Sequence, residues 1–329
     1  MIIMMNKCYS VFLLLFTLSM ATSAEPNHEL TYQLKASVVK VHVTTKTGGH
    51  GVGSGVVVDK DLVATNCHVL ANATGVNITK YGDSFAPVGL RADWKHDVCL
   101  LRFQYLDIKP VELGDSKHLQ YEQEIFSIGF PGGPPKPQVI YGNVKAVYPY
   151  EDSMIVRTDA AFVMGASGSP VFDTQGRLIA LNTFKSPGRS AYFYNVPVEW
   201  VKALMDKPET TSLQTEVSPF WDAPENARPY FMQVVGPYQN QDWQALEKIS
   251  EAWVNSEPSN AEAHYYLAYA QYNLDKKSTA MMHFEAALKL QPNHVATRMA
   301  QTLIKQGDGL SLAAKDAHGC TADHNTQGC

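Results

Sequence analysis

A chain of 329 residues is long enough to form two domains. Its content of 45% hydrophobic and 18% charged residues is typical of a folded globular protein and excludes an intrinsically disordered one. The chain has 27 basic and 32 acidic side chains, and the basic ones are not clustered in the sequence. Nucleic acid is therefore not an expected partner.

The N-terminal residues 1–24 have the pattern of a secretory signal peptide. Lys7 is followed by an apolar core from Val11 to Leu18 and then by small residues up to Ala24. This core is too short to span a bilayer, which favours a signal peptide cleaved after Ala24, with a short membrane anchor as the alternative. We therefore expect an exported protein, periplasmic in a bacterium or secreted, with no membrane span once the signal is removed.

Residues 25–206 are expected to form a mainly β domain. Short runs such as ASVVKVHVTT and EIFSIGF are rich in Val, Ile, Phe and Thr, and Gly, Pro, Asn and Asp separate them. Many short strands with turn residues between them predict an all-β barrel or sandwich. The run VPVEWVKALM, at 196–205, has helical spacing and is expected to close this domain.

The composition and periodicity of the sequence change twice in the C-terminal part of the chain. Residues 207–237 are rich in Pro, Thr and Ser and have no steady period, so we interpret them as a linker that packs on the β domain through Phe220 and Trp221. Residues 238–312 carry amphipathic helical patterns, and residues 313–329 form a polar tail.

The helical region resembles a small tetratricopeptide array. Pro258 and Pro292 are 34 residues apart, and each lies between two predicted helices. This period is typical of tetratricopeptide repeats, although about two units are fewer than independent stability usually requires, so the helices are expected to lean on the β domain. The stretch SNAE at 259–262 predicts a capping box in which Ser259 caps the helix.

A serine-containing stretch, MGASGSPV at 164–171, raises the question of chemistry. Gly and Ser dominate turns for backbone reasons alone, so by itself the stretch is equally consistent with a turn between strands. A serine hydroxyl becomes an effective nucleophile only beside a base, usually a histidine that a carboxylate orients. The rest of the chain must therefore supply both groups.

Candidates for the base and the carboxylate come from two other stretches. His68, in VATNCHVL, follows a predicted strand, although a lone histidine in this position is more often structural. Asp97, in DWKHDVCLLRF, immediately precedes an apolar strand, where a buried carboxylate needs a partner; Asp93 is the rival. The order His68, Asp97, Ser167 is that of the chymotrypsin-type triad.

These motifs together resemble the trypsin-like serine peptidases, and most closely those of the Deg/HtrA type, over about residues 35–205. The resemblance rests on TNCHV, HDVCLL and TDAAFVMGASGSPV, supported by GSGVVV, SIGFPGG and LIALNT. It implies a chymotrypsin-like fold of two β-barrels and a serine endopeptidase that works through an acyl-enzyme without a metal or organic cofactor. In this resemblance Ser167 is the nucleophile, His68 the general base and acid, and Asp97 the orienting group. The backbone N–H groups of Gly165 and Ser167 would form the oxyanion hole.

The resemblance also bears on substrate preference. Ala161 lies six residues before Ser167, where relatives that cut after Lys or Arg carry an aspartate. A small or medium apolar residue before the cut is therefore the expected preference. The residues expected to line one wall of the substrate cleft are Asn182, Thr183 and Phe184.

Four cysteines remain in the chain after the signal peptide. A disulfide between Cys67 and Cys99 is expected if His68 and Asp97 are in contact, because Cys67 directly precedes His68 and Cys99 lies two residues after Asp97. The alternative is a metal site made by Cys67, His68, His96 and Cys99, which lacks a Cys-x-x-Cys pair and would consume the histidine, so no metal is expected. Cys320 and Cys329 are candidates for a second disulfide in the tail.

Two functions are thus compatible with the sequence. One is an exported serine endopeptidase acting on a protein or peptide substrate, with helical repeats that bind a protein partner or the substrate. The other is a catalytically inactive protease-fold scaffold that binds proteins through its repeats. The complete set of Ser167, His68 and Asp97 favours the peptidase, since a scaffold has no need of all three.

Overall fold

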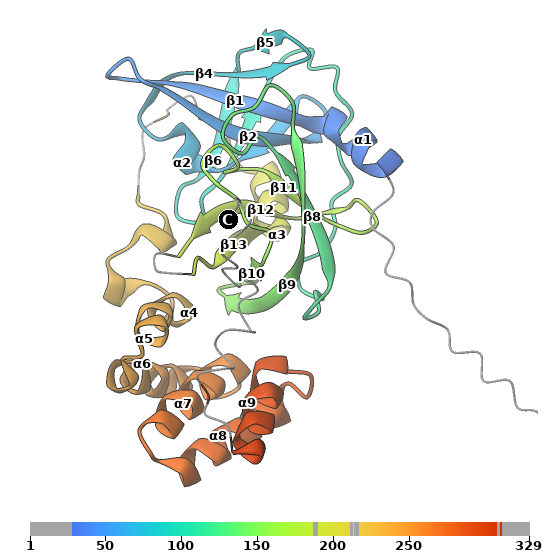
Figure 1. Cartoon of the computed structure of the whole chain (residues 1–329). Helices are drawn as coiled ribbons and strands as arrows, with labels where there is room; N and C mark the ends of the chain where they lie inside the picture. Colours follow the sequence, from blue (N-terminus) through green and yellow to red (C-terminus); the bar gives the residue numbers. More distant parts are fainter. Residues whose placement is uncertain (1–27, 187–189, 211–212, 214–216, 308–309, 311–329) are drawn as a thin grey trace, which may run out of the picture.

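The computed structural model describes residues 28–186, 190–210, 213, 217–307 and 310, and it shows a β domain followed by a helical region (Figure 1). The predicted signal peptide and the candidate pair Cys320 and Cys329 lie outside the described residues. Within the described ranges, no helix is both long and apolar enough to cross a membrane.

The first half of the β domain is an antiparallel sheet whose strand order is β5-β4-β1-β2-β3-β7-β6. Its strands are β1 (Val38–Thr45), β2 (His50–Asp59), β3 (Leu62–Thr65), β4 (Ala73–Lys80), β5 (Asp83–Phe85), β6 (Gly89–Asp93) and β7 (Val98–Arg102). Helix α1 (His28–Ser37) precedes β1, and the short helix α2 (Cys67–Leu70) follows β3. Valines at alternate positions of β1, such as Val41 and Val43, are buried as the period of a strand requires.

The second half closes into a barrel with the strand order β10-β13-β12-β11-β8-β9. Its strands are β8 (Glu124–Gly129), β9 (Gln138–Tyr150), β10 (Ser153–Thr158), β11 (Pro170–Asp173), β12 (Leu178–Lys185) and β13 (Phe193–Pro197), and α3 (Val198–Met205) follows. The predicted chymotrypsin-like architecture is confirmed, with one closed barrel and one half-barrel. The loops between strands meet where the two sheets face each other, and this is where the candidate residues lie.

Residues 217–307 are largely helical. Their elements are η1 (Phe220–Asp222), η2 (Glu225–Ala227), α4 (Tyr230–Gln233), α5 (Val235–Asn240), α6 (Trp243–Ser256), α7 (Ala261–Asn273), α8 (Lys277–Leu290) and α9 (Val295–Gln306). Helices α6 and α8 begin 34 residues apart, as do α7 and α9, and consecutive helices pack on each other. The predicted helical region is therefore confirmed, whereas its assignment to the tetratricopeptide family stays a prediction.

The predicted capping box is wrong by one residue. Asn260, not Ser259, is the N-cap of α7, and its side-chain oxygen accepts the backbone N–H groups of Glu262 and Ala263. A turn in which the N–H of Asn260 donates to the carbonyl of Glu257 sets this register. Asn is as effective as Ser in this role, so the sequence alone did not distinguish the two.

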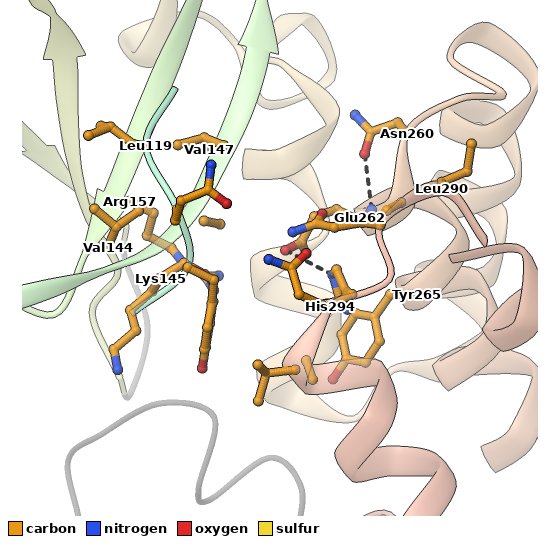
Figure 2. Close-up of a pocket in the computed structure, with 18 of the residues that line it drawn as sticks. Leu119, Val144, Lys145, Val147, Arg157, Asn260, Glu262, Tyr265, Leu290 and His294 are labelled. Carbon is orange, nitrogen blue, oxygen red and sulfur yellow. Dashed lines mark hydrogen bonds and ion pairs between the residues drawn. The ribbon is translucent and has the colours of Figure 1, made fainter. Parts of the chain in front are cut away.

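The helical region packs against the closed barrel through an aromatic contact. Phe231 of α4 is buried and stacks on Tyr148 of β9, with ring centroids 4.5 Å apart. A cavity of about 330 Å³ lies between the barrel and the helices, with Lys145 and Arg157 on the barrel side and Glu262 and His294 on the helices (Figure 2). The expected packing of the helices on the β domain is thus present, and one apolar core runs through both.

Candidate active site

Asp97 is a buried carboxylate that faces His68. It occupies the last position of the turn before β7, with a φ of +62°, a backbone conformation that Asp tolerates better than most residues. Its Oδ2 lies 2.6 Å from Nδ1 of His68, and its Oδ1 accepts the backbone N–H of His68 at 2.7 Å. With Nδ1 carrying the proton toward Asp97, Nε2 of His68 is left as the acceptor.

The rival carboxylate, Asp93, has a different partner. Its Oδ2 lies 2.6 Å from Nδ1 of His96, and Nε2 of the same histidine lies 2.9 Å from Oε2 of Glu151. The ring of His96 also stacks on Trp200, with centroids 4.1 Å apart. Asp93 and His96 therefore join the turn before β7 to the second barrel, and Asp97 is the carboxylate in contact with His68.

The loop that carries Ser167 begins with a tight turn from Val163 to Ala166. Gly165 has a φ of +93°, and a side chain there would lie 2.5 Å from the carbonyl oxygen of Phe130, so only glycine fits. The hydroxyl of Ser54, from the GSGVVV motif, donates to the carbonyl of Gly165 at 2.8 Å and accepts the N–H of Phe130 at 3.0 Å. A buried serine of the first sheet thus holds the loop of the second barrel.

The serine loop is also in contact with the residues that lead into His68. The backbone N–H of Ser54 donates to the carbonyl of Ser167 at 2.8 Å. A Cβ on Gly168 would lie 3.1 Å from the backbone nitrogen of Asn66, two residues before His68. Ser167 is half-buried and the His68 side chain is 27% exposed, whereas Asp97 is fully buried.

The residues expected to line the substrate pocket differ from one another in exposure. Ala161 is exposed, whereas Asn182, Thr183 and Phe184 on β12 are buried. The Asn182 amide donates to Ser127, the Thr183 hydroxyl to the carbonyl of Leu181, and Phe184 stacks on Tyr194. These side chains hold the second barrel together, and their role in a substrate pocket stays a prediction.

A disulfide joins Cys67 and Cys99, whose Cα atoms are 4.9 Å apart. It connects the first residue of α2 with β7 and is fully buried. The alternative metal site is not supported, because both sulfur atoms are in the disulfide and His96 bonds to carboxylates. No group of three or more metal-ligating side chains occurs among the residues that the structure describes.

Two contacts of the site were missed by the sequence analysis. The Asn66 side chain donates to the backbone carbonyl of Asp97 at 3.0 Å and to the hydroxyl of Thr183 at 3.1 Å, so it bridges the two sheets behind the site. The indole N–H of Trp221 donates to Oδ2 of Asp97 at 3.0 Å. Asn66 lies within the TNCHV motif and could have been singled out there, but nothing near Trp221 in sequence pointed to this contact.

Comparison with known proteins agrees with this geometry. Residues 53–181 match the trypsin-like peptidase domain family. The active form of the Rv3671c protease from M. tuberculosis has a similar fold, with a TM-score of 0.52 at 18% identity over 59% of this chain and 94% of that one. The β domain is therefore a trypsin-like peptidase domain.

The curated relatives show which group of serine peptidases the β domain resembles. The chloroplastic Protease Do-like 1 of Arabidopsis thaliana is 31% identical over 173 residues, which are 48% of this chain and 39% of that protein. A probable periplasmic serine endoprotease, DegP-like, of Pseudomonas fulva is 29% identical over 179 residues, 52% of this chain and 36% of that protein. The resemblance of the β domain to Deg/HtrA serine peptidases is confirmed, and the chain spans well under half the length of these relatives.

Proposed function

We propose that this protein is an exported serine endopeptidase in which Ser167, His68 and Asp97 act as a catalytic triad. The observation that carries the proposal is the buried carboxylate of Asp97, which bonds to both the ring and the backbone of His68. Burying a charge is costly unless it is paired, and a histidine partner on the solvent side is the arrangement that general-base catalysis requires.

The reaction follows from this arrangement. Oγ of Ser167 attacks the carbonyl carbon of the scissile peptide bond while Nε2 of His68 takes the hydroxyl proton. When the C–N bond breaks, His68 returns that proton to the leaving amine, and an acyl-enzyme remains on Ser167. Water then attacks the ester while His68 takes its proton, the bond from the acyl carbon to Oγ of Ser167 breaks, His68 returns the proton to Oγ, and the acid product leaves. Asp97 orients His68 and stabilises the imidazolium formed in each half of the reaction.

The oxyanion hole is assigned to the backbone N–H groups of Gly165 and Ser167. Within the described part of the chain, neither N–H has a hydrogen-bond acceptor, although the neighbouring Ala166 and Gly168 do. Donors without a partner beside a nucleophile are suited to stabilising a tetrahedral oxyanion, and removing one such donor typically costs about 3 kcal/mol of transition-state stabilisation.

Export, substrates and partners complete the proposal. The DegP-like relatives are named as probable periplasmic serine endoproteases, which supports residues 1–24 as a signal peptide and the export of this protein. The substrate is a protein or peptide, cut after a small or medium apolar residue, with Ala161, Asn182, Thr183 and Phe184 near the pocket. The helical region, proposed to be tetratricopeptide-like, binds a protein partner or holds the substrate.

The experiment is labelling of the purified mature protein with a fluorophosphonate probe, followed by mass mapping. Ser167→Ala is compared with Ser169→Ala, which removes the other serine of the same loop. We expect labelling of the wild type and of Ser169→Ala at residue 167, none of Ser167→Ala, and casein cleavage that follows the same pattern. Folded protein that is neither labelled nor active, with or without candidate partners of the helices, would instead favour the inactive scaffold.

A further inference from the structure

Trp221 reaches the proposed triad from outside the β domain. It lies in η1, within the segment that connects the β domain to the helices, 124 residues after Asp97. Its indole Nε1–H donates to Oδ2 of Asp97 at 3.0 Å, the same oxygen that faces Nδ1 of His68. Its ring also meets the His68 imidazole edge to face, with centroids 5.4 Å apart and planes at 87°.

The surroundings of Trp221 fix its position. The backbone N–H of Phe220 donates to the carbonyl of Lys95 at 2.9 Å, and the buried Phe220 ring stacks on Tyr150 at 4.7 Å. The Trp221 ring lies nearly parallel to Phe184, with centroids 5.4 Å apart and planes at 14°. The indole is therefore held from the first sheet and from the second barrel, on either side of the site.

We propose that Trp221 is a positioning residue of the active site and that the segment joining the two regions is part of the catalytic machinery. Oδ2 of Asp97 has two donors, the His68 ring and the Trp221 indole, whose directions together determine the rotation of the carboxylate. The edge-to-face contact restricts the His68 ring in turn. Hydrogen bonds to a charged group are among the stronger ones in proteins, so the loss of this one should be measurable. This inference rests on the proposed peptidase function.

The test compares two substitutions of the same type. Trp221→Phe keeps an aromatic ring against Phe184 and removes the N–H donor. Trp243→Phe is the matched control, because Trp243 lies in α6 and its ring packs on Tyr269 of the helical region, with centroids 5.7 Å apart. Both are made in the full chain, and kcat, KM and the rate of fluorophosphonate labelling are measured at matched folded fractions. The low-field proton NMR signal of the His68–Asp97 hydrogen bond is recorded as well.

We expect Trp221→Phe to lower kcat and the labelling rate roughly tenfold, with KM changed less than twofold, and to shift or broaden the low-field signal. Trp243→Phe should leave all of these close to wild type. A Trp221→Phe protein with wild-type kcat and an unchanged low-field signal would overturn the inference. If the wild type itself proves inactive, the proposed function fails, and the low-field signal still decides whether Trp221 positions Asp97.

Discussion

Nδ1 of His68 lies 2.6 Å from Oδ2 of Asp97, while the backbone N–H of His68 lies 2.7 Å from the other oxygen of that carboxylate. The two contacts fix the carboxylate against both the ring and the start of α2. Asp97 is fully buried and the His68 side chain is partly exposed. The negative charge therefore lies beneath the histidine, and Nε2 is left for the reaction.

Asp97→Asn should reduce kcat by roughly 10³- to 10⁴-fold. The amide carries no charge to stabilise the imidazolium, and its NH₂ group must oppose one of the donors that now face the carboxylate. Asp93→Asn is the matched control, because Asp93 bonds to His96 and not to His68. The measurement is kcat for casein or a peptide, together with the labelling rate. Equal losses in the two variants would show that Asp97 has no special role.

The Cys67–Cys99 disulfide should stabilise the β domain by about 3 to 4 kcal/mol, because it closes a loop of 32 residues in the unfolded chain. Reduction should lower the free energy of unfolding by that amount, measured in urea. The measurement uses a variant with Cys320→Ala and Cys329→Ala, so that reduction acts on the Cys67–Cys99 disulfide. Activity should fall as well, since the bond ties the residue before His68 to the strand after Asp97. An unchanged unfolding free energy on reduction would contradict this account.

His96 should make stability depend on pH. Burial opposes its charge, but the hydrogen bonds and charges of Asp93 and Glu151 together raise the pKa of His96 above 6.5. A raised pKa in the folded state means that this stabilisation is complete below pH 6.5 and is lost as the pH rises through the folded pKa. The free energy of unfolding, measured from pH 5 to 9, should therefore decline over that range because of this group.

The contribution of His96 is isolated by comparison with Glu151→Gln, which should flatten the decline. The comparison is needed because burial and His264 lower the pKa of His283, which adds the opposite slope below pH 6.5. If Glu151→Gln and the wild type have parallel profiles, His96 is not the group responsible.

Phe231→Ala should lower the free energy of unfolding by about 3 to 5 kcal/mol. The ring is buried between Tyr148 and Tyr194 of the barrel, and its loss opens a cavity where the helices meet the β domain. Unfolding in urea, followed by far-UV circular dichroism and by tryptophan fluorescence, measures the change. The wild type should unfold in one transition by both probes. Met282→Ala, at an exposed position on α8, should have little effect.

Much of the architecture was predictable because it depends on local patterns. Alternating apolar residues such as Val39, Val41 and Val43 define strands, and the 34-residue spacing of Pro258 and Pro292 predicted the helical region. The candidate triad residues were found because each lies in a short motif at a strand boundary. The residue type and its immediate neighbours are visible in the sequence, so these candidates can be recognised without knowledge of the fold.

What the sequence by itself determined is the class of the β domain, the helical region beyond it and the three candidate residues. Only the tertiary structure decided that His68 contacts Asp97 and not Asp93, that Asn260 caps α7, and that Trp221 bonds to Asp97. The sequence favoured Asp97 because it precedes an apolar strand, but it did not show which carboxylate faces His68, and Trp221 is 124 residues from its partner. Such contacts depend on how the two sheets and the connecting segment pack, and that packing is set by long-range burial rather than by any local pattern.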